Sequence, residues 1–427
     1  MSFRRVVYTV VTVCVVIVLA GVAWVWRPAI APISASAKPA FDRKTIDRGA
    51  ELALIGNCSD CHTKEGGASY AGGRGIPTPF GTIYASNLTP DAETGIGTWS
   101  EEAFRRAMHE GLDREGGQLY PAFPYDHFTK ATDEDIHALY AYLMSQAPVR
   151  NTIPANQLNF PFNYRPLVAG WKLLFLSRAN LEPDASKSAE WNRGRYLVEG
   201  LGHCGACHTP RNALGGEQKG SAYAGGVAEG WNAPPLNASL VAGHHWTVDQ
   251  LAEYLSSGWH QLHGAAAGPM ADVTKNLGQA SKEDVRAMAT YIASLSGPSG
   301  ETPEHVHALV DAGNEANARP EIVAIYNGAC AKCHNDRSTI GPSKALPLSL
   351  STAIHQSDAT NTVQVILNGI QSYRDGGGPY MPAFDGMFTD DQIAALAQYV
   401  RGRYSGQPPW TDVRAMIAKA RQQGAQP

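Results

Sequence analysis

Residues 58–62 read Cys-Ser-Asp-Cys-His, and the same Cys-x-x-Cys-His pattern returns at 204–208 and at 330–334. Two cysteines three positions apart on a helical turn present both sulfurs to one edge of a porphyrin, and the histidine that follows can reach the metal. The pattern is an attachment signal for c-type haem. The sequence therefore predicts three covalently bound haem c groups. The expected attachment residues are Cys58, Cys61, Cys204, Cys207, Cys330 and Cys333, and the expected axial histidines are His62, His208 and His334.

Two other uses of paired cysteines fit this sequence less well. A zinc ribbon needs four cysteines in paired sets, whereas each pair here stands alone in its own stretch of chain. A thioredoxin-like redox site needs a βαβ context, which the surrounding sequence does not show. The seventh cysteine, Cys14, lies in an apolar N-terminal run, so no cysteine is left for a structural disulfide outside the pairs.

The surroundings of the three motifs are also repeated. Short helical runs that open with Arg48-Gly49 and with Arg193-Gly194 lead to the first two motifs, and residues 321–329 lead to the third. We therefore read the chain as three copies of one structural unit, each far longer than a solenoid repeat.

A capped helix closes each copy. Thr132, Ser281 and Thr389 each have an acidic or amide residue three positions later, as in a capping box or a close relative of it. Apolar residues follow at helical spacing, and a tyrosine stands ten positions after each cap. Each copy thus reads helix, haem motif, loops and capped helix.

The predicted fold class is mainly α, with three tandem cytochrome c domains of the class I type preceded by a single N-terminal transmembrane helix. The predicted divisions are a membrane anchor and stalk (1–40), the first cytochrome c domain (41–150), a linker or arm (151–190), the second domain (191–296), a linker (297–318) and the third domain with a C-terminal tail (319–427).

The N-terminal residues predict an export signal that also serves as a membrane anchor. Two arginines precede the apolar run 6–26. This run has the ~20 residues that a bilayer crossing needs, and it is longer than a secretory signal core. A cleaved signal is the alternative, because residues 35–37 (Ala-Ser-Ala) resemble a cleavage site. We expect the bacterial inner membrane as the location, with a cytoplasmic N-terminus, a flexible stalk over 28–41 and periplasmic haem domains.

A second axial ligand, commonly methionine, is expected before each closing helix. Met270 and Met381 stand in Gly/Pro-rich loops at this place in the second and third copies, which favours ligation over core filling. The first copy has Phe123 there, which cannot bind iron. His127 is the nearest capable residue, with Met108 or an open site as the alternatives. Because Met/His ligation raises the iron potential, we expect the first haem to have the lowest one.

Composition and motifs restrict the function. Charged residues make up 17% of the chain and the net charge is −4, so nucleic acid is not an expected partner. The sequence shows no dinucleotide motif after a strand and no recognisable Ser-His-Asp grouping, so we expect no enzyme activity of its own. An electron-transfer subunit is the leading interpretation. The alternatives are a peroxidase-like haem enzyme acting at an incompletely ligated first haem, and a stand-alone quinol-to-oxidase electron wire.

Further motifs between about residue 41 and residue 405 give a resemblance to a known family. They lie at 56–58, 70–73, 79–84, 87–90, 95–97, 119–122 and 203–212. Through them the chain resembles the triheme cytochrome c subunits of membrane-bound bacterial dehydrogenases. These subunits serve alcohol, gluconate or sorbitol dehydrogenases, or molybdopterin aldehyde and nicotinate- or isoquinoline-type oxidoreductases.

The resemblance implies a catalytic dehydrogenase subunit as partner, with or without a small iron–sulfur subunit, and ubiquinone or a terminal oxidase as acceptor. Two departures bear on the branch of the family. Phe123 stands where alcohol and gluconate members usually have methionine, and the apolar segment is N-terminal, whereas some members attach near the C-terminus. Together with residues 126–129 and 228–231, these departures favour the molybdopterin-linked branch over the alcohol or gluconate branch.

Overall fold

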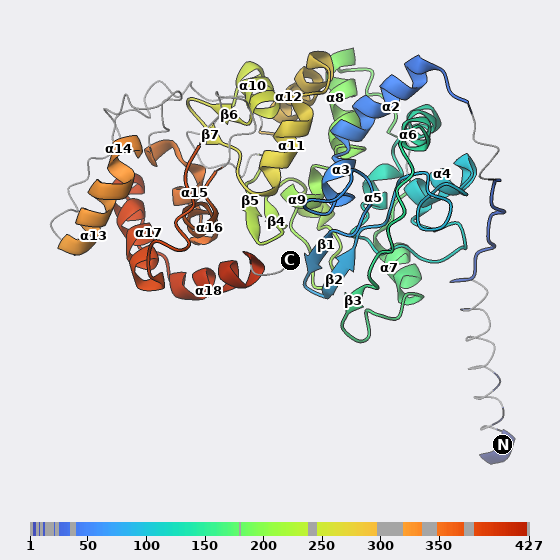
Figure 1. Ribbon diagram of the computed structural model, residues 1–427, viewed down its shortest axis with the longest axis horizontal. Helices are drawn as coiled ribbons and strands as arrows, with labels where there is room; N and C mark the ends of the chain where they lie inside the picture. The colour runs from blue at the N-terminus through green and yellow to red at the C-terminus, as the bar shows by residue number, and fades with distance from the viewer. Residues whose placement is uncertain are drawn as a thin grey trace. The chain divides into compact units, whose positions relative to one another are not determined.

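The computed structural model describes most of the chain after residue 39 and part of the N-terminus. The described stretches are 40–178, 181–237, 246–296, 319–334, 348–370 and 380–424, with 25–34 and a few earlier positions. The chain divides into two compact units. Figure 1 labels their helices and strands. Unit 1 comprises Met1–Ala53 with Cys61–Leu181, and unit 2 comprises Leu54–Asp60 with Glu182–Pro427. The boundaries of the three domains stay predictions, and the linker 297–318 lies outside the described residues.

The predicted transmembrane helix over 6–26 is wrong. None of the helices in the described part of the chain combines the length and the apolar character that a bilayer crossing requires. Most of 6–26 lies outside the described residues. The prediction rested on composition and length alone, and these do not determine the backbone conformation that a segment adopts.

The described start of the segment predicted as a stalk, residues 28–33, makes hydrogen bonds to unit 1. The backbone N–H groups of Ile30 and Ile33 donate to the carbonyls of Arg114 (2.9 Å) and Thr98 (3.0 Å). The Arg106 guanidinium donates to the carbonyl of Pro28 at 2.7 Å. Residues 28–33 therefore lie along unit 1, because an extended segment rich in Ala and Pro still offers backbone groups that a folded surface can bind.

The first copy of the repeat consists of helices around a small sheet. Its elements are α2 (Arg43–Ile55), α3 (Cys58–Cys61), β1 (Gly75–Thr78), β2 (Gly81–Tyr84), α4 (Glu101–Glu110), α5 (Tyr125–Phe128), α6 (Asp133–Met144), β3 (Gln157–Leu158) and α7 (Leu167–Phe175). The strand order is β1-β2-β3, with both pairs antiparallel. Helix α6 begins where predicted, since the Thr132 hydroxyl accepts from the N–H of Asp135. Its apolar face is buried, as its helical spacing predicted.

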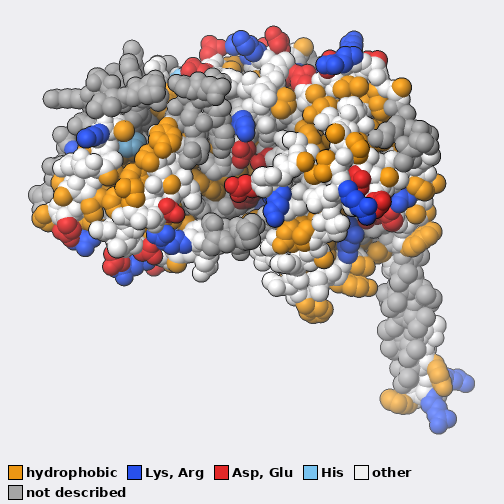
Figure 2. Space-filling model, in the orientation of Figure 1, with side chains coloured by type: hydrophobic (Ala, Val, Ile, Leu, Met, Phe, Trp, Pro, Cys, Tyr) orange, Lys and Arg blue, Asp and Glu red, His pale blue; other side chains and the backbone are white. Residues whose placement is uncertain are grey.

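Apolar side chains remain exposed on the segment from β3 to α7. Phe160, Leu173 and Leu174 are 85%, 72% and 65% exposed, whereas Val168 and Ala169 of α7 are buried. On the face of the molecule that Figure 2 displays, hydrophobic side chains lie among basic and acidic ones. Helix α7 thus buries only one side, although its sequence is apolar almost throughout.

The second copy follows the same order. Its elements are α8 (Ala189–Glu199), α9 (Gly205–His208), η1 (Lys219–Ser221), β4 (Gly226–Ala228), β5 (Trp231–Ala233), α10 (Val248–Ser257), β6 (Trp259–His260), β7 (Gly264–Ala265), α11 (Pro269–Leu277) and α12 (Lys282–Leu295). Strands β4 and β5 form one antiparallel hairpin, and β6 and β7 form another. The core gathers around Leu197, Leu277 and Met288, each at most 2% exposed.

The third copy has a separate core. Its elements are α13 (Pro320–Ile325), the π-helical turn η4 (Tyr326–Cys330), α14 (Ala331–His334), η5 (Leu348–Leu350), α15 (Thr352–His355), α16 (Thr360–Asn368), α17 (Asp390–Ser405) and α18 (Val413–Gly424). Tyr326, Val363 and Ile393 form the centre of the core and are at most 1% exposed. Helix α17 begins with the predicted capping box, formed by Thr389 and Gln392.

The first helix and the closing helix touch at a glycine in each of the first two copies. A Cβ atom added at Gly49 of α2 would overlap the backbone carbonyl of Ala138 in α6. A Cβ atom added at Gly194 of α8 would overlap the carbonyl of Ala287 in α12 in the same way. Only glycine permits this distance between the helix backbones, so the repeated Arg-Gly dipeptide is a packing signal.

Replacing Gly49 with alanine tests this crossing. We expect the Gly49→Ala variant to lose about 1–3 kcal/mol of stability or more, because the added methyl group must push the two helices apart. Gly170→Ala in α7 is the matched control, since no neighbouring atom lies within 4 Å of its Cβ position. Calorimetry of both purified variants makes the comparison, and equal transition temperatures would contradict the packing role of Gly49.

Candidate haem-binding sites

Each Cys-x-x-Cys-His motif lies on or beside a short helical segment that follows the first helix of its copy. In the first two copies, the residue before the first cysteine has a left-handed backbone: φ is 52° at Asn57 and 38° at His203. Asn and His tolerate this conformation better than branched residues do. The turn ends the long helix and starts the short one that carries the cysteines.

A backbone carbonyl orients the histidine that follows the second cysteine. Nδ1 of His62 lies 2.6 Å from the carbonyl oxygen of Ser86, and Nδ1 of His208 lies 2.7 Å from that of Pro234. A carbonyl can only accept, so the hydrogen is on Nδ1 and the Nε2 lone pair is left to bind a metal. Burial lowers the pKa of both imidazoles, which favours this neutral form. The donor set therefore fits haem iron.

The loop after each of these histidines folds back onto the motif. In the first copy, the N–H of Tyr70 donates to Thr63 Oγ1 (3.2 Å) and the N–H of Gly72 donates to the carbonyl of His62 (2.7 Å). The second copy has the corresponding bonds from Tyr223 to Thr209 Oγ1 (3.1 Å) and from Gly225 to His208 (2.9 Å). The repeated Tyr-Ala-Gly-Gly sequence thus fixes the loop around the histidine.

The thiols of Cys58, Cys204, Cys207 and Cys330 are not poised for ionisation. Burial raises the pKa of Cys58 and Cys204 to about 12 and that of Cys207 and Cys330 to about 11. A redox or zinc-binding cysteine needs a thiolate at neutral pH, which these surroundings disfavour. A thioether bond to haem carries no charge and therefore suits a buried position.

The two methionines predicted as axial ligands lie beside the cores of their own copies. Met270 is partly buried against the core of the second copy, in the first turn of α11 and not in the predicted loop. Met381 is partly buried against the core of the third copy, and its backbone pairs with Ile370 through two hydrogen bonds of 2.9 Å. Their roles as ligands stay predictions.

The first copy buries both candidates for its second ligand. His127 lies in α5 and Met108 in α4, and each is 5% exposed. Phe123 packs its ring edge-on against that of Phe128, with 5.3 Å between centroids. Aromatic packing thus occupies the place that a methionine has in the other copies. The choice between His127, Met108 and an open site stays a prediction.

The third copy is described in part. Cys330 closes the turn η4, and Cys333 and His334 lie on α14. Residues 335–347 lie outside the described residues. The hydroxyl of Tyr326 donates to the carbonyl of His334 at 3.4 Å.

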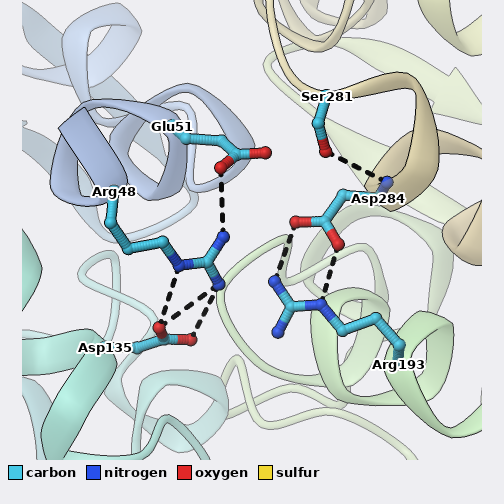
Figure 3. Close-up of polar contacts among 6 residues, drawn as sticks. All are labelled: Arg48, Glu51, Asp135, Arg193, Ser281 and Asp284. Carbon is cyan, nitrogen blue, oxygen red and sulfur yellow. Dashed lines mark hydrogen bonds and ion pairs between the residues drawn. The ribbon is translucent and has the colours of Figure 1, made fainter. Parts of the chain in front are cut away.

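An arginine–aspartate pair locks the helix crossing beside the first two sites (Figure 3). Arg48 reaches both Asp135 (3.3 Å) and Glu51 (3.1 Å). Arg193 binds Asp284 with two hydrogen bonds of 2.8 Å. Each aspartate is also the third residue of the closing helix, where its N–H donates to the capping hydroxyl. Each aspartate thus takes part both in the cap at the start of the closing helix and in the ion pair at the helix crossing.

These positioning groups were not predicted from the sequence. The Arg48–Asp135 and Arg193–Asp284 pairs do have a signal, because both partners recur at the same places in two repeats. The carbonyls of Ser86 and Pro234 have none, since a backbone oxygen is present at every residue.

Comparisons with known proteins agree with this geometry. The family described as "Cytochrome c" matches residues 46–147, and the family described as "Cytochrome C oxidase, cbb3-type, subunit III" matches residues 317–400. The chain is 45% identical over 411 residues to a nicotinate dehydrogenase subunit of Pseudomonas putida, and the match covers 93% of this chain and 33% of that relative. The chain thus spans about a third of that relative's length.

Two shorter relatives match along most of their own length. The fructose dehydrogenase cytochrome subunit of Gluconobacter japonicus is 35% identical over 391 residues, covering 85% of this chain and 80% of the relative. The cytochrome c subunit of the quinone alcohol dehydrogenase of Gluconobacter oxydans is 34% identical over 405 residues. That match covers 90% of this chain and 84% of the relative.

The Arg193–Asp284 pair should stabilise the second copy measurably. The side chains are 30% and 11% exposed, so Asp284→Asn removes a carboxylate charge beside a partly buried guanidinium. We expect a loss of about 1–3 kcal/mol in the free energy of unfolding, measured by urea denaturation. Asp249→Asn is the control, because Arg286 and Asp249 in its pair are 53% and 81% exposed, and we expect no measurable change there. Equal losses in the two variants would contradict a locking role.

Proposed function

Since the chain belongs to the family of cytochrome c subunits of bacterial dehydrogenase complexes, we propose that it carries three haem c groups and passes electrons from a catalytic dehydrogenase to ubiquinone or a terminal oxidase. Its relatives are the electron-transfer subunits of such complexes, so this chain is an electron-transfer subunit and not a catalytic one. The cytochrome c family implies covalently bound haem c.

The observation that carries the proposal is the same histidine geometry in two copies. In both, a carbonyl at 2.6–2.7 Å leaves Nε2 free to bind iron, next to cysteine thiols that burial keeps uncharged. The third site rests on its Cys-x-x-Cys-His motif and on the family match over 317–400.

The proposed assignment gives each residue one task. When bound, haem c supplies a reversible one-electron couple. The cysteine pairs at 58–61, 204–207 and 330–333 would hold the porphyrin edge, and His62, His208 and His334 would bind the iron. Met270 and Met381 would complete the second and third sites, with His127 or Met108 at the first. The surrounding core excludes water from buried parts of each site, which tunes the potential.

The partner that we propose is a dehydrogenase of the N-heterocycle type. The support is the higher identity to the nicotinate dehydrogenase relative, 45%, than to the fructose and alcohol dehydrogenase relatives, 35% and 34%. Phe123 at the methionine position supports the same branch. We further propose that the haem domains work in the periplasm, since arginines followed by an apolar run are the features of an export signal.

Purification of the native complex through a tag on this chain tests the function. We expect three haem masses on the intact polypeptide and a large dehydrogenase subunit in the same fraction. The double variant Cys204→Ser/Cys207→Ser should carry two haem masses, because thioether bonds cannot form there. A wild-type chain that carries two haem groups or fewer would contradict the three-haem proposal. A dehydrogenase of the alcohol or gluconate class in the fraction would overturn the choice of partner.

Redox titration tests the axial ligands. Met270→His and Met381→His should each lower one midpoint potential by on the order of 0.1 V or more, because a thioether favours reduced iron more than an imidazole does. In the wild-type protein, the haem with the lowest potential should be the first one. Met387→Leu is the control, since Met387 is 66% exposed in the third copy. If neither histidine variant shifts a midpoint potential, these methionines do not bind the iron. Cyanide binding with a high-spin first haem would instead support the peroxidase-like alternative.

A further inference from the structure

The hairpin β4–β5 touches the second candidate haem site from two sides. Its turn residues Glu229 and Gly230 have φ of 48° and 79°, which is the backbone of a tight two-residue hairpin. Pro234, whose carbonyl orients His208, follows β5 directly. The indole ring of Trp231 lies against Gly268, where any side chain would overlap it. Gly268 stands two residues before Met270, so the hairpin contacts the segments that carry both proposed ligands.

The same hairpin also binds helix α16 of the third copy. The N–H of Asn232 donates to Asn361 Oδ1 at 2.8 Å, and Asn361 Nδ2 donates back to the carbonyl of Asn232 at 2.8 Å. Asn232 Nδ2 donates to Asp358 Oδ1 at 2.9 Å. Gln364 Nε2 adds a bond to the carbonyl of Gly230 at 3.3 Å. Asn361 thus pairs with the outer edge of β5 as a neighbouring strand would.

Helix α16 connects this contact to Met381, the axial ligand proposed for the third site. It ends at Asn368, and Gly369 follows with φ of 70°. The next residue, Ile370, exchanges both backbone hydrogen bonds with Met381 at 2.9 Å. A continuous series of covalent and hydrogen bonds therefore joins the carbonyl that holds His208 to the backbone of Met381.

The first copy uses its hairpin differently. Its second strand, β2, pairs with β3 of the same unit, at Gly81 with Leu158 and at Thr82 with Gln157. An unpaired hairpin edge exposes backbone N–H and C=O groups that another segment can bind. In the second copy, the edge of β5 at Asn232 is bound by Asn361 of the third copy.

We propose that Asn232, Asn361 and Asp358 form a latch that positions the second haem site against the third for electron transfer. The inference rests on the proposed function, because it needs haem groups at 204–208 and 330–334. The three residues are positioning residues and touch neither the thiols nor the imidazoles described above. No bond is made or broken in the step that they serve, which moves one electron between the two sites.

The full-length holoprotein with Asn232→Asp tests the latch. The new carboxylate loses the bond to Asp358 and repels it, so the contact should open. We expect faster amide exchange over 226–233 and 360–368, and a broadened haem–haem distance distribution in pulsed EPR. Electron transfer between the second and third sites should become several-fold slower, while the spectrum and midpoint potentials stay unchanged.

Rescue and control variants sharpen the test. Adding Asp358→Asn to Asn232→Asp exchanges donor and acceptor and should restore much of the spacing and the rate. Asn212→Asp is the control in the second copy, because its oxygen still accepts from Leu214 and Gly216. Asn361→Ala replaces Asn232→Asp if that protein does not fold.

The outcomes separate the latch from the proposed function. Wild-type protein without haem at the second or third motif would refute the proposed function itself. The latch would be refuted if both haem groups are present and the Asn232→Asp protein behaves like the wild type. Its amide exchange, its haem–haem distance and its electron-transfer rate would then all be unchanged. A changed spacing with an unchanged rate would make the contact structural only, which also overturns the positioning role.

Discussion

The structure depends on the close crossing of the first helix with the closing helix in the first two copies, α2 with α6 and α8 with α12. Gly49 and Gly194 let backbone approach backbone, and Asp135 and Asp284 anchor the crossing through an arginine. Because each haem motif begins where the first of these helices ends, the crossing fixes the start of the cysteine helix. The carbonyl that orients the histidine is then delivered by a hairpin further along the chain. The contacts that hold the scaffold together therefore also position the candidate site.

The third copy reaches the same order of elements by other means. Gln392 stands where the first two copies have an aspartate, and it completes a capping box instead of an ion pair. The first helix is short and passes into the π-helical turn η4 before the cysteines. Apolar burial around Tyr326 and Ile393 replaces the charged lock. The order of elements was retained while the interactions that hold them changed.

Sequence reasoning predicted much of this architecture, because the signals were local. The capped helices at Thr132, Ser281 and Thr389 begin where the hydroxyl pattern placed them. The N-terminal prediction of a spanning helix failed because composition and length alone do not determine the conformation of a segment. The Ser86 and Pro234 carbonyls, the Asn232–Asn361 contact and the helical setting of Met270 were missed for a related reason. They depend on backbone geometry or on residues far apart in sequence, which no short motif encodes.

The pairing of the first helix with the last has a consequence for biogenesis. A domain of this design cannot close until its closing helix has left the ribosome, because contacts distant in sequence form late. The cysteine motif, made near the start of each domain, is therefore synthesised well before the frame that buries it. A maturation enzyme that attaches haem would meet an open, accessible peptide during that interval. Folding around an already attached group would then add its apolar surface to the core, so that cofactor loading and domain closure reinforce each other.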